Sequence, residues 1–98
     1  MTGRIVDASE ALAIGMVDRV VPAAELANET AKLAQTIAAG PPLAVAGIKR
    51  AVAAAERNDL RAQLELEAEH QVRAFQSSDA AEGMNAFYEK RPPAFRGE

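Results

Sequence analysis

His70 is the only histidine in this 98-residue chain, so any histidine-dependent nucleophilic site would require it. The sequence contains no cysteine, which excludes a thiol nucleophile and thiolate metal ligands. His70 stands within a predicted helix beside Glu67 and Glu69, and a catalytic histidine also needs a cleft and a partner. We therefore interpret His70 as a surface or hydrogen-bonded helix histidine and expect no catalytic role for it.

The 14 acidic residues do not mark out a pair for acid–base chemistry. Asp7 and Glu10 stand three residues apart at the start of one predicted helix, and Asp79 and Glu82 do so at another. This is the spacing of a capping box, so we interpret all four as helix caps. Zinc- and calcium-ligand spacings are absent, and the six scattered glycines form no phosphate-binding loop. The sequence predicts neither a metal nor a cofactor.

The segment EKRPPAFR near the end of the chain gathers three cations, Lys90, Arg91 and Arg96. Two interpretations follow from the residues alone. Cations in the last turn of a helix complement the helix dipole, and the same cations can also bind an anion. Without further information the helix-dipole interpretation is the simpler one.

Composition limits the classes of partner. The formal net charge of −3 and the lack of a basic stripe argue against a general nucleic-acid binder. No secretory segment occurs, and no apolar run approaches the ~20 residues that span a bilayer, so we expect a soluble, cytoplasmic protein without a membrane partner. Alanine supplies 23 residues and large aromatic side chains are few. Such a composition favours helices that pack against something else.

Capping and breaking residues predict a mainly helical chain. Gly15 and Gly40 are expected to end the first two helices, Gly40 in the left-handed conformation, and Pro42 is expected to begin the third. Asn58 and Asp59 are expected to start the fourth. The expected helices cover about 7–15, 23–39, 42–57, 59–75, and 79 to the RPP segment at 91–93.

The third and fourth predicted helices carry different apolar faces. In the third, alanines make the face smooth, and Gly47 is expected to permit close helix packing. The fourth has a face at helical spacing that is interrupted once, by Gln71; its members are Leu60, Leu64, Ala68, Gln71, Val72 and Phe75.

The segment MVDRVVP at 16–22 predicts one short strand near 17–21. Val17, Val20 and Val21 are β-branched, and Pro22 ends a ladder because it lacks an N–H. A single strand leaves its backbone donors and acceptors without partners, and no second convincing strand occurs in the sequence. We therefore expect the partner strands to lie outside this chain.

Three ordered segments carry a family resemblance: TGRIVDASEALAIGMVDRVVPAAEL, PPLAVAGIK and DAAEGMNAFYEKRPPAF. Together they resemble the C-terminal third of the crotonase superfamily, the enoyl-CoA hydratase/isomerase family, over essentially the whole chain. The resemblance implies the C-terminal helical part of a crotonase-like (ClpP/crotonase) α/β fold. Residues 1–22 would then be the end of the crotonase core, and residues 23–98 a helical trimerisation and lid region.

The resemblance also implies chemistry. Family members act on acyl-CoA thioesters through an enolate-like intermediate whose oxyanion is held by two backbone N–H groups, and hydratases use two glutamates. In the family's order these groups precede the TGR segment, so no catalytic residue is assigned here, and the 98 residues alone are expected to be inactive. Coenzyme A would be part of the substrate and not a cofactor.

One site residue carries over by resemblance. The lysine of the family's F-x-E-K-R string, here Lys90, contacts the phosphates of CoA bound to a neighbouring subunit in several members. This favours an anion contact for Lys90 over the helix-dipole interpretation. Arg91 is a weaker candidate, and packing is the expected role of Phe87 and Tyr88. The family also implies a homotrimer or a dimer of trimers.

Three interpretations stay open. The chain is the C-terminal part of an enoyl-CoA hydratase-type enzyme, with hydration of a 2-enoyl-CoA as the expected reaction. Alternatively, it is a non-enzymatic helical module that oligomerises or docks onto a partner. The third is a self-sufficient monomer. Met1 stands where the full-length family continues without a break, so we expect a truncated form, a gene fragment or an internal start.

Overall fold

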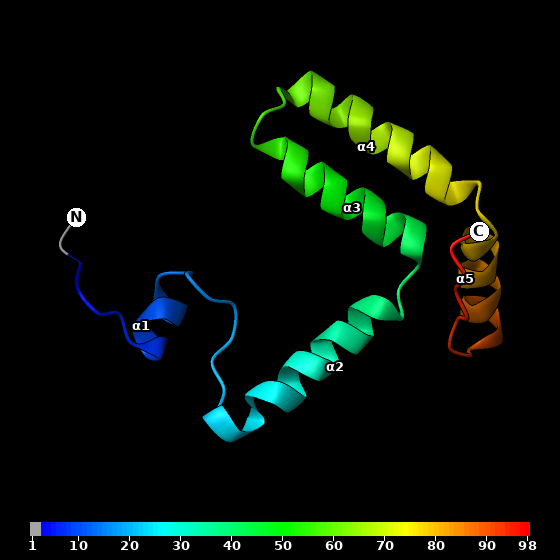
Figure 1. Ribbon diagram of the computed structural model, residues 1–98. Coiled ribbons are helices and arrows are strands. Elements are labelled where there is room, and N and C mark those ends of the chain that lie inside the picture. Colours follow the sequence, from blue (N-terminus) through cyan, green and yellow to red (C-terminus); the bar gives the residue numbers. More distant parts are fainter. Residues whose placement is uncertain (1–2) are drawn as a thin grey trace. The chain divides into compact units, whose positions relative to one another are not determined.

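The computed structural model describes residues 3–98, and these residues confirm a mainly helical chain (Figure 1). The N-terminal part contains α1 (Ala8–Ala13), a 3-10 turn η1 (Ala23–Glu25) and α2 (Leu26–Ala38). The remainder contains α3 (Pro42–Ala55), α4 (Leu60–Phe75) and α5 (Ser78–Glu89). All five helices expected from the sequence are present.

The strand predicted near residues 17–21 does not form. These residues adopt no regular secondary structure, with a bend at Asp18, and Val17 and Val20 are 39% and 43% exposed. A strand requires a neighbour whose backbone groups it can bond, and the part of the chain that the structure describes contains no other strand. The β-branched segment therefore has no strand to pair with among the described residues.

The predicted helix ends are partly confirmed. Asp7 and Asp59 cap α1 and α4, accepting the backbone N–H groups of Glu10 and Ala62, each at 2.8 Å. Gly15 ends the α1 region at φ 72°, and Pro42 begins α3. Gly40 is not left-handed as expected. A Cβ at this position would lie 3.2 Å from the Ile37 carbonyl oxygen, so close approach explains this glycine better.

Neither of the two expected capping boxes forms. Glu10 does not return to the start of α1; both of its oxygens accept from the Arg4 guanidinium, at 2.5 and 2.7 Å. At α5 the cap is Ser77, whose hydroxyl accepts from the Ala80 N–H at 3.2 Å. Asp79 and Glu82 are therefore free for other contacts, which are described below.

The chain divides into two compact units, residues up to Leu33 and residues 34–98. In the second unit α3 and α4 run antiparallel, side by side, and α5 packs against α4 (Figure 1). The α3–α4 contact is close because Gly47 is buried against the fourth helix. A Cβ at Gly47 would lie 3.2 Å from Cβ of His70. The packing role expected for Gly47 is confirmed.

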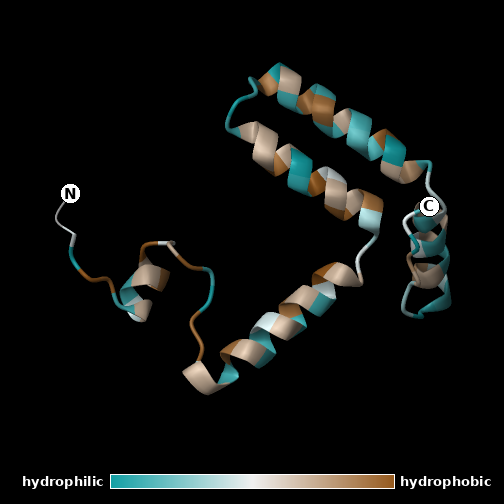
Figure 2. Cartoon of the chain, viewed as in Figure 1, coloured by the Kyte–Doolittle hydropathy of each residue, from teal (hydrophilic) through white to brown (hydrophobic). Residues whose placement is uncertain are grey.

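Large apolar side chains are mostly exposed. Among residues 3–98 the buried hydrophobic residues are Ala11 and Ala86 alone, and hydrophobic residues follow both α3 and α4 in Figure 2. The helices thus leave most of their large apolar side chains open to solvent.

The fourth helix turns its polar side toward α3. Its groove with α3 is lined from α4 by Gln63, Glu67, His70, Gln71 and Ala74. Leu60, Leu64, Val72 and Phe75 of the predicted stripe are 76, 56, 55 and 67% exposed. The apolar stripe of α4 is therefore uncovered within this chain. In the part of the chain that the structure describes, no helix is both long and apolar enough to cross a membrane.

Candidate functional site

The C-terminal end of α5 turns on Lys90, the one non-glycine residue with a positive φ among residues 3–98. Its φ and ψ are 54° and 38°. The Lys90 N–H donates to the Phe87 carbonyl at 3.3 Å, and the Arg91 N–H donates to the Ala86 carbonyl at 3.0 Å. These two bonds form a Schellman motif, in which the left-handed residue is usually glycine. A lysine here costs on the order of 1 kcal/mol of backbone strain.

Arg91 is held by two glutamates. Its guanidinium donates to both carboxylate oxygens of Glu82, at 2.5 and 2.9 Å, and to Glu89 at 2.6 Å. The Arg91 hydrogen bonds, joined by the Ala94 N–H, lower the pKa of Glu82 from 4.5 to about 2. The same carboxylates raise the pKa of Arg91. The Arg91 charge is therefore already engaged within the chain.

Residues 91–98, which we call the strap, run back along α5 and are tied to it by backbone hydrogen bonds. The Ala94 N–H donates to Glu82 Oε1 at 2.8 Å. Asp79 accepts the N–H groups of Arg96 and Gly97 on its two oxygens, at 2.7 and 2.8 Å. The carbonyl of Glu98 accepts from the Ser78 N–H at 2.6 Å. The carboxylates of α5 thus anchor the returning chain.

Asp79 is buried, with 4% of its surface exposed. A buried carboxylate is costly unless its oxygens are hydrogen-bonded, and here each oxygen accepts one backbone N–H. Phe95 also packs on α5 at Gly83, where an added Cβ would lie 3.6 Å from the Phe95 ring. Polar and apolar contacts together hold the strap to one side of α5.

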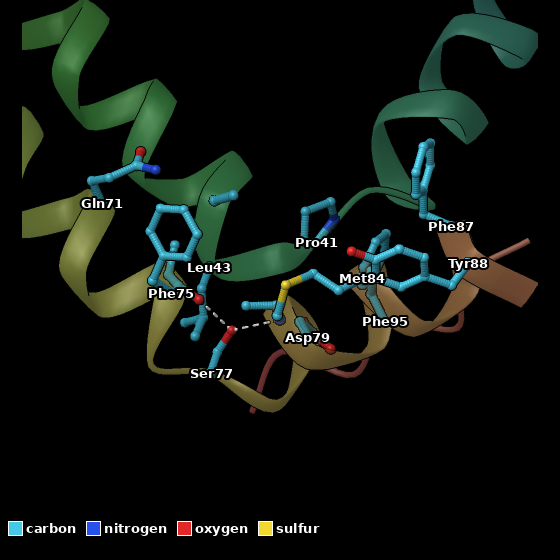
Figure 3. Close-up of a pocket in the computed structure, with 14 residues that line it drawn as sticks. Pro41, Leu43, Gln71, Phe75, Ser77, Asp79, Met84, Phe87, Tyr88 and Phe95 are labelled. Carbon is cyan, nitrogen blue, oxygen red and sulfur yellow. Dashed lines mark hydrogen bonds between the residues drawn. The ribbon is translucent and has the colours of Figure 1, made fainter.

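An apolar groove of about 410 Å³ lies where α3, α4 and α5 meet. Figure 3 shows Phe75, Met84 and Phe95 around it, with Ser77 and Asp79 among its polar residues. Phe87 and Tyr88 belong to the same lining and are each 80% exposed. The groove has the character of a surface for an apolar group.

The three cations of the C-terminal segment differ in their contacts. The Arg91 side chain is paired with Glu82 and Glu89, and the backbone N–H of Arg96 donates to Asp79. The Lys90 side chain is exposed and has no hydrogen-bond or ion-pair partner among the described residues. Lys90 therefore stands at a chain reversal with its charge available. The phosphate contact of Lys90 stays a prediction.

His70 is neither on the surface nor hydrogen-bonded, so that expectation is wrong. It is half-buried, and its Nε2 atom is buried without a hydrogen-bond partner. The cause is the close approach of α3 at Gly47, which covers the imidazole. Residues 3–98 contain no group of three potential metal ligands.

The anchoring roles of Asp79 and Glu82 were missed from the sequence. Their spacing fits a capping box, and the backbone groups that they bind lie 12 to 18 residues further along the chain. One local signal was available. Ser77, immediately before α5, is itself a good N-cap, which leaves Asp79 without a capping task.

Comparison with known proteins gives a consistent result. The family model "Enoyl-CoA hydratase/isomerase" matches residues 1–98. A probable enoyl-CoA hydratase of Rhodobacter capsulatus is 41% identical over 92 residues, which are 94% of this chain and 36% of that protein. The 1,2-epoxyphenylacetyl-CoA isomerase of Escherichia coli is 38% identical over 98 residues, 100% of this chain and 37% of that protein.

Solved structures show the same likeness. The crystal structure of an enoyl-CoA hydratase from Bacillus anthracis superposes with a TM-score of 0.93 at 36% identity, covering 99% of this chain and 38% of that one. The chain therefore spans little more than a third of the length of the relatives that it matches.

Proposed function

The chain belongs to the enoyl-CoA hydratase/isomerase family, and we propose that it works as the C-terminal helical part of an enzyme acting on acyl-CoA thioesters. Hydration of a 2-enoyl-CoA, a reaction of fatty acid metabolism, is the activity that we assign to the complete enzyme. The match along the whole chain at a TM-score of 0.93 carries this proposal. The chain supplies helical packing, subunit contacts and part of the CoA site.

Lys90 is the proposed binding residue. An ammonium is a suitable point charge for a phosphate of CoA, and the Lys90 side chain is exposed and unpaired within the described residues. Arg91 is not assigned this role because Glu82 and Glu89 occupy its guanidinium. We assign no catalytic residue in this chain.

We further propose a homotrimer, or a dimer of trimers, in the cytoplasm, with residues 1–22 contributing to the core of the fold and residues 23–98 to the lid and subunit contacts. The exposed apolar side chains of α3 and α4 support a packing role. Smooth, alanine-rich faces suit close helix contacts between subunits.

A chimera tests the proposal. The aligned C-terminal segment of the Rhodobacter capsulatus relative is replaced by this chain, and hydration of crotonyl-CoA is measured. We expect activity from the chimera and none from the 98 residues alone. Lys90→Ala in the chimera should raise KM by about tenfold, as expected for losing a charged hydrogen bond.

Lys49→Ala is the matched control, because Lys49 is another exposed lysine, on α3. It should leave KM unchanged. Turnover by the purified 98 residues would refute the proposed division of roles, and an unchanged KM in Lys90→Ala would remove Lys90 from the site.

The exposed apolar surface also favours a second candidate, a non-enzymatic module that oligomerises or docks onto a partner. Sedimentation of the chain alone distinguishes the candidates. A discrete oligomer that does not bind CoA would support the module, whereas a cooperatively melting monomer would support a self-sufficient protein.

A further inference from the structure

The strained conformation at Lys90 requires a cause within the chain. A left-handed lysine at the end of a helix relaxes unless the residues that follow it are held in place. Here the following residues are held, because Asp79 and Glu82 bind three backbone N–H groups of the strap, those of Ala94, Arg96 and Gly97. The chain reversal at residue 90 is therefore held by its two Schellman bonds and, in addition, by the carboxylates in the first two turns of α5.

We propose that Asp79 and Glu82 are positioning residues for Lys90: by tying the strap to α5 they hold residue 90 left-handed and direct its ammonium beyond the end of the helix, toward a phosphate of CoA. The phosphate half of this proposal rests on the proposed function. The conformational half rests on the hydrogen bonds alone.

Glu82 has a second effect on the same site. It engages both terminal nitrogens of Arg91, and Glu89 engages the third. Two adjacent cations would otherwise compete for one anion and repel each other. With the Arg91 guanidinium engaged by Glu82 and Glu89, Lys90 is the one of these two adjacent cations whose side chain has no partner among the described residues, which suits a point contact to a phosphate.

The first readout follows the backbone of the full 98-residue chain by NMR. In the parent, the Cα shift of Lys90 should report the left-handed conformation, and heteronuclear NOEs should show an ordered strap. Asp79→Asn keeps the shape but offers only one acceptor oxygen to two N–H donors. The double variant with Asp79→Asn and Glu82→Gln should lose both signals at residues 90–97.

Glu89→Gln is the matched control, because Glu89 accepts from the Arg91 side chain, whereas the backbone N–H groups of Ala94, Arg96 and Gly97 are bound by Glu82 and Asp79. It should leave Lys90 and the strap unchanged, and the amide shifts of α5 confirm that each variant folds. A Lys90 that remains left-handed and ordered in the double variant would overturn the conformational half.

The second readout is CoA binding, titrated into the same chain and followed by NMR. Lys90→Gln should weaken binding about tenfold, and the double strap variant about three- to tenfold. If Asp79 and Glu82 act on CoA binding through residue 90, the double strap variant should cause no further loss of binding in a chain that already carries Lys90→Gln. An equal loss in both backgrounds would overturn the positioning role.

Lys90→Gly separates conformation from charge. Glycine keeps the left-handed turn, so the strap should stay ordered while CoA binding falls as in Lys90→Gln. If the parent and Lys90→Gln bind CoA equally, or if neither binds it, the proposed phosphate contact of Lys90 is wrong. The NMR measurement of the backbone still decides, independently, whether the strap holds residue 90 left-handed.

Discussion

Two regions of the second unit are stabilised in different ways. In α5 and the strap, the buried residues are an alanine and an acid, Ala86 and Asp79, and hydrogen bonds from side-chain carboxylates to the backbone hold the segment together. In the α3–α4 pair, glycine and alanines allow close approach, and Ile48 and Val52 are 63% and 68% exposed. The first region is held together by directional polar contacts, although Phe87 and Tyr88 on its apolar side are each 80% exposed. The second is held by close packing of small residues, and it too presents apolar surface that its own unit does not cover.

This difference assigns different tasks to the two regions. Directional hydrogen bonds fix one conformation, which suits a segment that must present Lys90 in a defined place. Apolar area is not directional and contributes about 25 cal/mol per Å² only when it is removed from water. The α3–α4 pair therefore gains most of its stability when another surface covers it.

The largest effect is expected at Asp79. Asp79→Ala leaves the Arg96 and Gly97 N–H groups without their acceptors, and we expect the strap to lose about 2–3 kcal/mol of local stability. Hydrogen exchange of these two amides measures it. Asp59→Ala is the control: it removes an exposed cap of α4 at a cost of about 1 kcal/mol and should not change strap exchange. Equal exchange in parent and Asp79→Ala would show that the strap is not held by this acid.

A smaller loss is expected at the α3–α4 contact. Gly47→Leu places a side chain where even a Cβ would lie 3.2 Å from His70, and we expect about 1–3 kcal/mol of destabilisation. Urea unfolding followed by circular dichroism measures it. Ala46→Leu, at the neighbouring exposed position, should cost less than about 0.5 kcal/mol. Similar losses at both positions would mean that the pair is loosely packed.

Acid should weaken the attachment of the strap at Glu82. The pKa of Glu82 is lowered from 4.5 to about 2, because Arg91 and the Ala94 N–H stabilise its charged form. A lowered folded-state pKa means that the Glu82 contribution is complete above its ordinary pKa and is lost as the pH falls through about 2. The Ala94 amide shift should titrate with that midpoint.

Glu89→Gln serves as a control for the titration, since Glu82 keeps both of its contacts to Arg91 in that variant. A midpoint of the Ala94 shift in the ordinary glutamate range would contradict the Glu82–Arg91 pair in solution.

Features that depend on neighbours in the sequence were predictable. Asp7 and Asp59 cap helices through N–H groups three residues away, and Pro42 begins a helix through its own ring geometry. The family resemblance, not the spacing of residues, indicated Lys90. Its role at a phosphate stays a prediction.

Features that depend on distant partners were not predictable. The Val-rich segment at 17–21 has strand propensity, but a strand exists only when another strand bonds to it. Asp79 matches a cap by spacing, while its partners lie 17 and 18 residues away. His70 gave no sign that Gly47 would cover it, because that contact joins two helices.

The smallest change in stability is expected for substitution of Phe87, although its side chain is large. Phe87 and Ala86 are neighbours in α5, yet Phe87 is 80% exposed and Ala86 2%. Side-chain size alone predicts that Phe87→Gln is the more damaging change. Burial predicts the reverse: Phe87→Gln should change stability by less than about 0.5 kcal/mol, and Ala86→Gln should cost about 1–3 kcal/mol because it overpacks the contact. Thermal melting of the two variants measures both. A larger loss for Phe87→Gln would mean that the apolar side of α5 is already covered when the chain is alone, and would contradict the 80% exposure of Phe87.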